Sequence, residues 1–112
     1  WKDWGFTWEM ERDSAPNYFD PSHPAVNVLT DLYNEMTGQE TKPYVMGGGT
    51  YARYMKNTVA FGATISAYRG LLGEGKGGAH ERDEYISREE VIRAAQIFVL
   101  SLLRLKKVYS GN

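Results

Sequence analysis

The sequence predicts an α/β fold, because segments with a two-residue repeat of apolar side chains are mixed with segments of helical repeat. Near the N-terminus, large apolar residues alternate with small or polar ones, as in a strand with one buried face. Two later segments repeat apolar residues every three or four positions, as amphipathic helices do. The expected order is strand, helix, strand, glycine turn, strand, loop and helix.

The first expected strand covers residues 4–11, and its apolar face carries Trp4, Phe6, Trp8 and Met10. A loop rich in Pro, Asn, Asp and Ser follows it. A helix is predicted to begin at Pro24, whose missing N–H would be unpaired in the first turn. His23 is expected to mark that helix start. Gly38, which accepts a left-handed backbone, is expected to end the helix.

The middle of the chain predicts two short strands on either side of a glycine turn. Residues 44–46 are expected to form the second strand, which leads into Gly47-Gly48-Gly49-Thr50. Thr50 is a suitable N-cap for a brief helical stretch that reaches about Lys56. Residues 58–65 are β-branched and apolar, which predicts a buried third strand.

The last part of the chain predicts a long loop and then a long helix. Residues 66–86 are rich in glycine and charge, and loops of this length are usually functional or mobile. Ser87 and Glu90 form a capping-box pattern, which indicates a helix start. The residues expected on the buried face of this helix are Val91, Ala95, Phe98, Leu102 and Leu105.

Composition limits the classes of function. The 13 Lys+Arg and 14 Asp+Glu residues give a net charge of -1, which argues against a nucleic-acid partner. No apolar run reaches the roughly 20 residues that span a bilayer. The absence of cysteine excludes thiolate sites and fits a cytoplasmic location. The strand pattern begins almost at the first residue, so the chain is expected to be a segment of a longer protein.

The turn Gly47 to Arg53 is the first candidate site. Gly48 and Gly49 lack a Cβ and let backbone N–H groups approach a ligand closely. A helix that starts at Thr50 would direct its positive end to the same point. Arg53 could grip a carboxylate or a phosphate through two hydrogen bonds. The alternative is a plain glycine turn beside a solvated arginine.

His80 is the second candidate, as a metal ligand held late in a glycine-rich loop. A solvated surface histidine is the alternative, since one imidazole cannot hold zinc and position 84 is Glu where an HExxH motif needs His. Asp83 or Glu84 could orient the imidazole of His80 by accepting a hydrogen bond from its second ring nitrogen. Gly73, Gly75 and Gly78 formally match GxGxxG, but they do not lie between a strand and a helix.

Together, GGGTYARYMKNTVAFG and GGAHERDEYIS, followed by an amphipathic helix, resemble the C-terminal portion of the M20 metallopeptidases. The nearest group is the PepV-like dipeptidases, also described as Xaa-His or carnosinase-like dipeptidases. The resemblance implies a two-domain exopeptidase with two zinc ions in the catalytic domain and an inserted lid domain. Residues 1–57 would then be the end of the lid, and residues 58–112 the end of the catalytic domain.

The resemblance also assigns roles to single residues. His80 falls at the family's last zinc ligand, Arg53 where the substrate's C-terminal carboxylate is gripped, and Gly78 in a loop lining the substrate site. The glycines Gly48 and Gly49 belong to the same substrate-binding turn as Arg53. The family usually has Gln-Ala-Asn after the histidine, whereas this chain has residues 81–83 as Glu-Arg-Asp, which puts the contacts behind the ligand in doubt.

The implied reaction is zinc-assisted attack of water on the peptide bond of a dipeptide. The catalytic base and the other metal ligands would lie outside this chain, so the segment is not expected to be active alone. Two alternatives are a related amidohydrolase of N-acyl amino acids and a non-enzymatic module that binds a small carboxylate. The isolated segment is expected to self-associate, because its last strand and helix would expose apolar surface.

Overall fold

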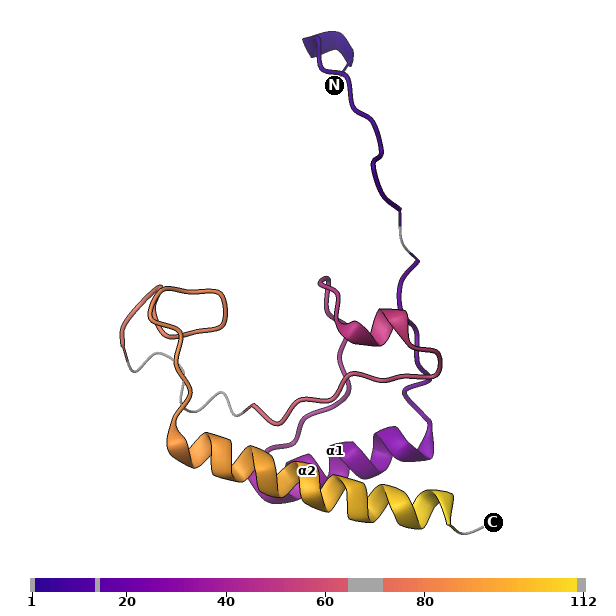
Figure 1. Cartoon of the computed structure of the whole chain (residues 1–112), viewed down its shortest axis with the longest axis vertical. Coiled ribbons are helices and arrows are strands. Elements are labelled where there is room, and N and C mark those ends of the chain that lie inside the picture. Colours follow the sequence, from indigo (N-terminus) through magenta and orange to yellow (C-terminus); the bar gives the residue numbers. More distant parts are fainter. Residues whose placement is uncertain (1, 14, 65–71, 111–112) are drawn as a thin grey trace.

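Two helices packed against each other form the centre of the computed structural model, and the remaining segments extend from this pair (Figure 1). The structure describes residues 2–13, 15–64 and 72–110. Its elements are the 3-10 helix η1 (Lys2–Trp4), α1 (Pro24–Thr37), the 3-10 helix η2 (Tyr51–Tyr54) and α2 (Arg88–Tyr109). None of the helices in these residues is long and apolar enough to cross a membrane.

Both α-helices begin and end on local signals, and both were predicted correctly. The ring Nδ1 of His23 accepts the N–H of Ala25 at 3.1 Å, so His23 is the N-cap and Pro24 the first residue of α1. Gly38 ends this helix with φ 69°, and its N–H donates to the carbonyl of Asn34. In α2, the Ser87 hydroxyl accepts the N–H of Glu90, and the Glu90 carboxylate accepts the N–H of Ser87.

The core lies between α1 and α2. Leu32 of α1 and Ile97 of α2 are completely buried, and Ser101 is buried beside Ile97 on the same face of α2. At the rim, Arg104 donates to both carboxylate oxygens of Glu35 at 2.8 and 3.0 Å. This contact joins the two longest elements, although they are separated by 50 residues of chain.

The prediction of which face of α2 is buried was wrong. Val91, Phe98 and Leu102 are exposed, Ala95 is exposed beside them, and Leu105 is only half-buried. α2 carries apolar residues on two faces, and its periodicity cannot tell which one meets α1. Contact with α1 selects the stripe of Ile97 and Ser101, about 100° around the helix from Phe98 and Leu102.

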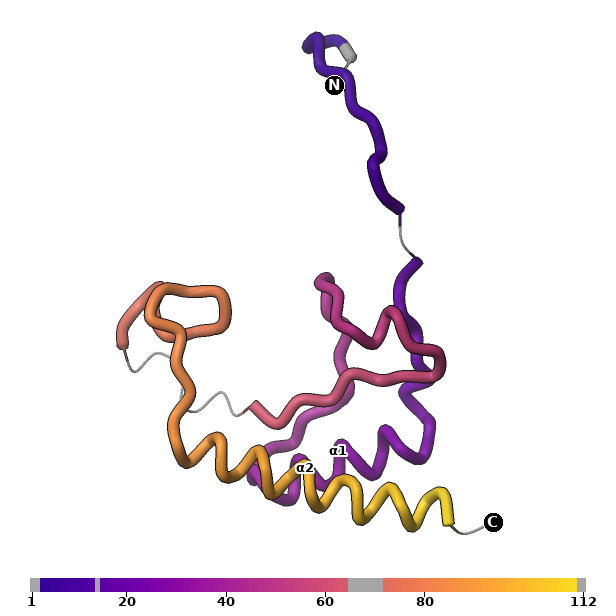
Figure 2. The backbone as a smooth tube through the Cα atoms, viewed as in Figure 1, coloured from indigo at the N-terminus to yellow at the C-terminus, as the bar shows by residue number. Residues whose placement is uncertain are grey.

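The three expected strands are not formed in the part of the chain that the structure describes, so the α/β prediction is correct for its helices and wrong for its strands. A strand needs the N–H and C=O groups of a neighbouring strand. Residues 4–11 instead leave a turn at Gly5 and run outward, away from the helices (Figure 2). Residues 44–46 are exposed coil, and Val45 is 99% exposed.

Residues 58–64 also form no strand, but they do lie against the helix pair. Phe61 packs edge-on against Phe98 with ring centroids 5.9 Å apart, and Ala63 is buried. The Tyr33 hydroxyl donates to the carbonyl of Thr64 at 2.8 Å. Ile65, and residues 66–71 of the expected loop, lie outside the described residues.

The chain is extended for its length. Its radius of gyration is 18.5 Å, whereas a compact domain of this size has about 13 Å. The principal extents of 59 × 43 × 21 Å agree with the open outline in Figure 1. Much apolar surface is therefore left in contact with solvent, including Trp4, Phe6, Trp8 and Met10.

Candidate functional site

The predicted turn before Arg53 is present, and Thr50 caps it as expected. The Thr50 hydroxyl accepts the N–H of Ala52 at 3.2 Å, and the Thr50 carbonyl accepts the N–H of Arg53 at 3.2 Å. The helix that follows, η2, is a four-residue 3-10 helix. This helix is too short for its dipole to contribute much to anion binding, so anion binding at the turn would depend on the Arg53 side chain.

Arg53 folds back over the glycine turn. A Cβ built on Gly49 would lie 2.5 Å from Cζ of Arg53 and 2.7 Å from its Nη2. The guanidinium therefore occupies the space that any side chain at position 49 would need. At Gly48 the nearest atom is the Met46 methyl, at an ordinary 3.8 Å. Gly49 is thus the one of these two glycines whose missing side chain matters for Arg53.

The guanidinium of Arg53 is exposed and forms no ion pair with the residues that the structure describes. Its planar donor groups therefore remain available to a ligand. A carboxylate can accept two parallel hydrogen bonds from such a group, which fixes both its position and its orientation. The turn is chemically suited to a small carboxylate.

His80 lies in a tightly turned loop at residues 72–86. Its backbone is left-handed, with φ 66°, which is uncommon for a residue other than glycine. The N–H of His80 donates to Oε2 of Glu84 at 3.4 Å. The prediction that Asp83 or Glu84 orients His80 thus finds a contact to Glu84, but at the backbone rather than at the imidazole.

Gly78 and Glu81 close the turn that carries His80. The Gly78 N–H donates to Oε2 of Glu81 at 2.8 Å, and the Glu81 N–H donates to the Gly78 carbonyl at 3.0 Å. A Cβ on Gly78 would lie 2.6 Å from the same carboxylate oxygen. Glu81 stands where the resembled family usually has Gln. Its role in the turn was missed from the sequence, although its spacing of three from Gly78 fits a side chain that reaches back to the backbone.

The structure does not bring Arg53 and His80 together. In Figure 1 the loop of residues 72–86 and η2 project as two separate arms from the helix pair. Each arm keeps its own local contacts, Gly49 with Arg53 in one and Gly78 with Glu81 in the other. Residues 65–71, which connect the arms along the chain, are not among the described ones.

A complete zinc site is not formed by the residues that the structure covers. No group of three or more His, Asp or Glu side chains among them is arranged to hold a metal ion. Tetrahedral zinc requires three or four protein ligands. His80 can therefore supply at most one ligand, and any metal bound there would need ligands from outside this arrangement.

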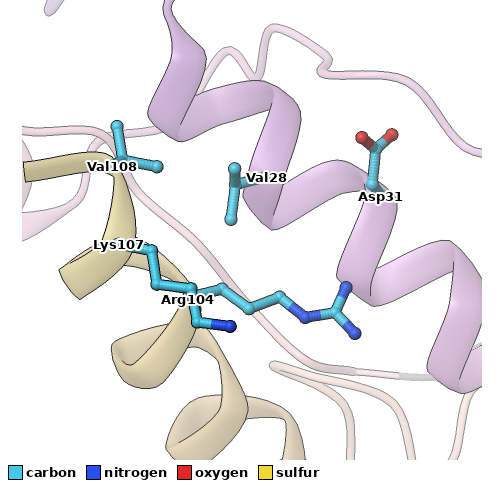
Figure 3. A pocket seen from close by; sticks show the side chains of 5 residues that line it. All are labelled: Val28, Asp31, Arg104, Lys107 and Val108. Carbon is cyan, nitrogen blue, oxygen red and sulfur yellow. The ribbon is translucent and has the colours of Figure 1, made fainter. Parts of the chain in front are cut away.

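Two hollows lie along the helix pair, and neither contains a predicted site residue. One, of about 420 Å³, is lined by Val28, Asp31, Arg104, Lys107 and Val108. Figure 3 shows Arg104 reaching from α2 across to α1 in this hollow, where it is already paired with Glu35. The other, of about 580 Å³, is lined by Met36, Ile92, Ala95, Gln96, Val99 and Leu100. Both are consequences of helix packing rather than candidate active sites.

Comparison with known proteins adds the family context. Residues 5–104 match the model of peptidase family M20/M25/M40. The chain is 36% identical over 101 residues to a protein of Staphylococcus saprophyticus named "Putative dipeptidase", covering 90% of this chain and 20% of that protein. A Staphylococcus epidermidis protein of the same name is also 36% identical over 101 residues, with the same coverage.

Proteins from Staphylococcus aureus with this name are 33% identical over 102 residues, which is 91% of this chain and 20% of theirs. The chain therefore spans about a fifth of the length of the curated relatives it matches. No solved structure matches it significantly.

Proposed function

The chain belongs to peptidase family M20/M25/M40, and from this premise we propose that it is part of a dipeptidase, a hydrolase that cleaves the peptide bond of dipeptides. The names of its relatives support the substrate class. In this proposal the segment contributes to substrate binding and to the metal centre. It does not cleave substrate alone, because the catalytic base and most metal ligands belong to other parts of the enzyme.

Arg53 is proposed to bind the C-terminal carboxylate of the dipeptide. The observation that carries this role is the exposed guanidinium folded over Gly49, which forms no ion pair within residues 2–13, 15–64 and 72–110. A free dipeptide differs from a longer peptide in presenting its carboxylate one residue from the bond to be cut. A cation at a fixed distance from that bond would therefore select the last peptide bond of a peptide, which is the only bond of a dipeptide. Exclusion of longer peptides would depend on the site that receives the amino end.

His80 is proposed as one ligand of a two-zinc centre, and Gly78 as part of the backbone that lines the substrate site. His80 lies exposed at a left-handed turn of the loop, where its N–H contacts Glu84, so its imidazole is accessible to ligands from outside this segment. The remaining ligands would come from the other four-fifths of a protein of the relatives' length. Residues 1–57 are assigned to the lid domain and residues 58–112 to the catalytic domain. The cytoplasmic location stays a prediction.

The test compares a dipeptide with its C-terminal amide in the intact enzyme. Arg53→Ala should raise KM for the dipeptide by about 10- to 100-fold, the loss of a charge-assisted pair. The same substitution should change cleavage of the amide little, because the amide has no carboxylate for Arg53 to bind. Lys56→Ala, which removes a nearby exposed cation, is the matched control and should leave both substrates unaffected.

Equal losses on dipeptide and amide would show that Arg53 does not recognise the carboxylate. N-acyl amino acids in the same assay separate the dipeptidase from an amidohydrolase of that class, since these substrates share the carboxylate but lack the free amino group. Carboxylate binding by the 112-residue chain, followed by NMR with N-acetylglycine, together with no hydrolysis of either substrate class by the intact protein, would favour the third possibility, a non-enzymatic binding module.

A further inference from the structure

The loop of residues 72–86 is closed by contacts at two levels, a base and a tip. At the base, the Gly77 N–H donates to the Arg82 carbonyl at 2.8 Å, and the Tyr85 N–H donates to the Gly77 carbonyl at 3.4 Å. A Cβ built on Gly77 would lie 2.5 Å from Cε1 of Tyr85, so the Tyr85 ring lies directly against the Gly77 backbone. Gly77 is buried there and has a left-handed backbone, with φ 83°. The base therefore ties the two sides of the loop together.

At the tip, Gly78 and Glu81 are joined by two hydrogen bonds. The Glu81 N–H donates to the Gly78 carbonyl at 3.0 Å, which makes residues 78–81 a four-residue turn with His80 as its third residue. The Gly78 N–H donates to Oε2 of Glu81 at 2.8 Å. The first hydrogen bond is the one that defines such a turn, whereas the second depends on the Glu81 side chain. Glu81 therefore adds a contact that the backbone alone would not make.

His80 occupies the position of this turn where a side chain is least favoured. Its φ is 66°, in the left-handed region that is uncommon for residues other than glycine. Such a conformation persists only where the surrounding contacts hold it. The N–H of His80 donates over 3.4 Å, to Oε2 of Glu84. Of the two side-chain contacts to the backbone at the tip, that of Glu81 is the shorter and joins both ends of the turn.

We propose that Glu81 is a positioning residue, which holds Gly78 and His80 in one turn and so raises the affinity of the site for zinc. The inference rests on the proposed function, in which His80 binds zinc and Gly78 lines the substrate site. The turn fixes the backbone of His80 relative to Gly78, although the imidazole can still rotate about its own bonds. A ligand whose backbone is already ordered loses less conformational entropy when it binds a metal.

This role depends on an oxygen acceptor at position 81 and not on a charge there. Glu81→Gln keeps a side-chain oxygen of the same reach, whereas Glu81→Ala removes it. Gly78→Ala leaves the charge unchanged but displaces the carboxylate, because the added Cβ would lie 2.6 Å from Oε2 of Glu81. Glu74→Ala is the matched control, since it removes an exposed carboxylate from the same loop outside the turn.

Amide exchange in the 112-residue chain, followed by NMR, tests the contact without any metal. The protection factor of the N–H at position 78 should fall about three- to tenfold in Glu81→Ala and in Gly78→Ala, the loss of one hydrogen bond. Glu81→Gln and Glu74→Ala should leave it unchanged. Equal protection in Glu81→Ala and the parent would overturn the proposal, because Glu81 would then not hold Gly78.

Zinc affinity of the intact protein, measured by competition with a chelator, tests the consequence. Glu81→Ala and Gly78→Ala should weaken zinc binding about tenfold, the lower end of the effect of residues that support a metal ligand. Glu81→Gln and Glu74→Ala should keep the parent affinity. If Glu81→Gln weakens zinc binding as much as Glu81→Ala does, the proposal is wrong, because the charge rather than the turn would support the metal.

The outcomes separate this inference from the proposed function. Zinc binding and dipeptide hydrolysis that Glu81→Ala leaves unchanged would refute the role of Glu81 and leave the dipeptidase standing. An intact protein that neither binds zinc nor hydrolyses dipeptides would refute the proposed function and this role with it. Circular dichroism of each variant checks that α1 and α2 remain, so that a general loss of the fold is not counted as a loss of the turn.

Discussion

Arg53 and Gly49 are matched to each other: the guanidinium occupies the position where a side chain at residue 49 would begin, 2.5 Å from the Cζ of Arg53. The two residues are four apart, so this match is local to the turn and to η2. The absence of a side chain at Gly49 therefore leaves room for the guanidinium of Arg53 directly against the backbone of the turn.

Gly49→Ala should therefore displace the guanidinium without disturbing the fold. The added methyl needs the space of Arg53, whose far end is flexible and can move away. If the intact protein is the proposed dipeptidase, we expect its KM for a dipeptide to rise about tenfold, which is less than the full loss of a charge-assisted hydrogen bond. Gly48→Ala is the control, since its Cβ meets only the Met46 methyl at 3.8 Å. Similar effects of the two substitutions would argue against a special role for Gly49.

Leu32→Ala should be the most damaging single truncation in the helix pair. The side chain is completely buried between α1 and α2, and its loss would leave a cavity that costs about 2–5 kcal/mol of unfolding free energy. Urea denaturation followed by circular dichroism measures this. Val45→Ala, at a 99% exposed position, should stay within about 0.5 kcal/mol of the parent. Little difference between the two would mean that the helix pair is not the core.

The Arg104–Glu35 pair should contribute little to the free energy of unfolding, despite its short distances. Both carboxylate oxygens accept from one guanidinium nitrogen, but the side chains are 37% and 60% exposed. Solvent screening limits such pairs to about 0.2–1 kcal/mol. A double-mutant cycle with Arg104→Ala and Glu35→Ala should give a coupling free energy in that range. A value several times larger would indicate that this rim is buried in solution, as in an assembly.

Ser87 should matter for α2 through its hydroxyl. It accepts the N–H of Glu90 at 3.1 Å, and Ser87→Ala should cost about 1 kcal/mol of unfolding free energy. Ser87→Gly also removes the hydroxyl, but it leaves the N–H groups open to water. Its cost should be only about a few tenths of a kcal/mol of unfolding free energy. Thermal melts of both variants measure this difference. Equal losses of stability in the two variants would indicate a general effect of substitution rather than the loss of the cap.

The carboxyl of Asp20 makes the stability of the fold depend on pH in a direction that can be stated. Hydrogen bonds from the hydroxyl and then the backbone N–H of Ser22 lower the pKa of its carboxyl from the ordinary 3.8. A carboxyl with a lowered folded pKa contributes stability above its unfolded value and loses it as pH falls through the folded value. Ser22→Ala should raise the pKa of Asp20, measured by carbon NMR of the carboxyl. An unchanged pKa would contradict the hydroxyl contact.

Helix positions were predictable because their signals are short-range. His23, Pro24 and Gly38 delimit α1 within a few residues, and Ser87 with Glu90 starts α2 through two reciprocal hydrogen bonds. Thr50 caps η2 in the same way. The turn that holds Arg53 belongs to this class, so half of the candidate site was accessible from the sequence. The Gly78–Glu81 contact was local too, but its signal was not recognised.

The sequence by itself determined the helices, their caps and the two candidate arms, because each depends on atoms a few residues apart. Only the tertiary structure decided which face of α2 is buried, because contact with α1 chose between two apolar stripes of similar quality. It also decided that residues 4–11, 44–46 and 58–64 form no strands, since a strand depends on a partner's hydrogen bonds rather than on its own pattern. For the same reason, the distance between Arg53 and His80 is set by packing between segments far apart in the chain.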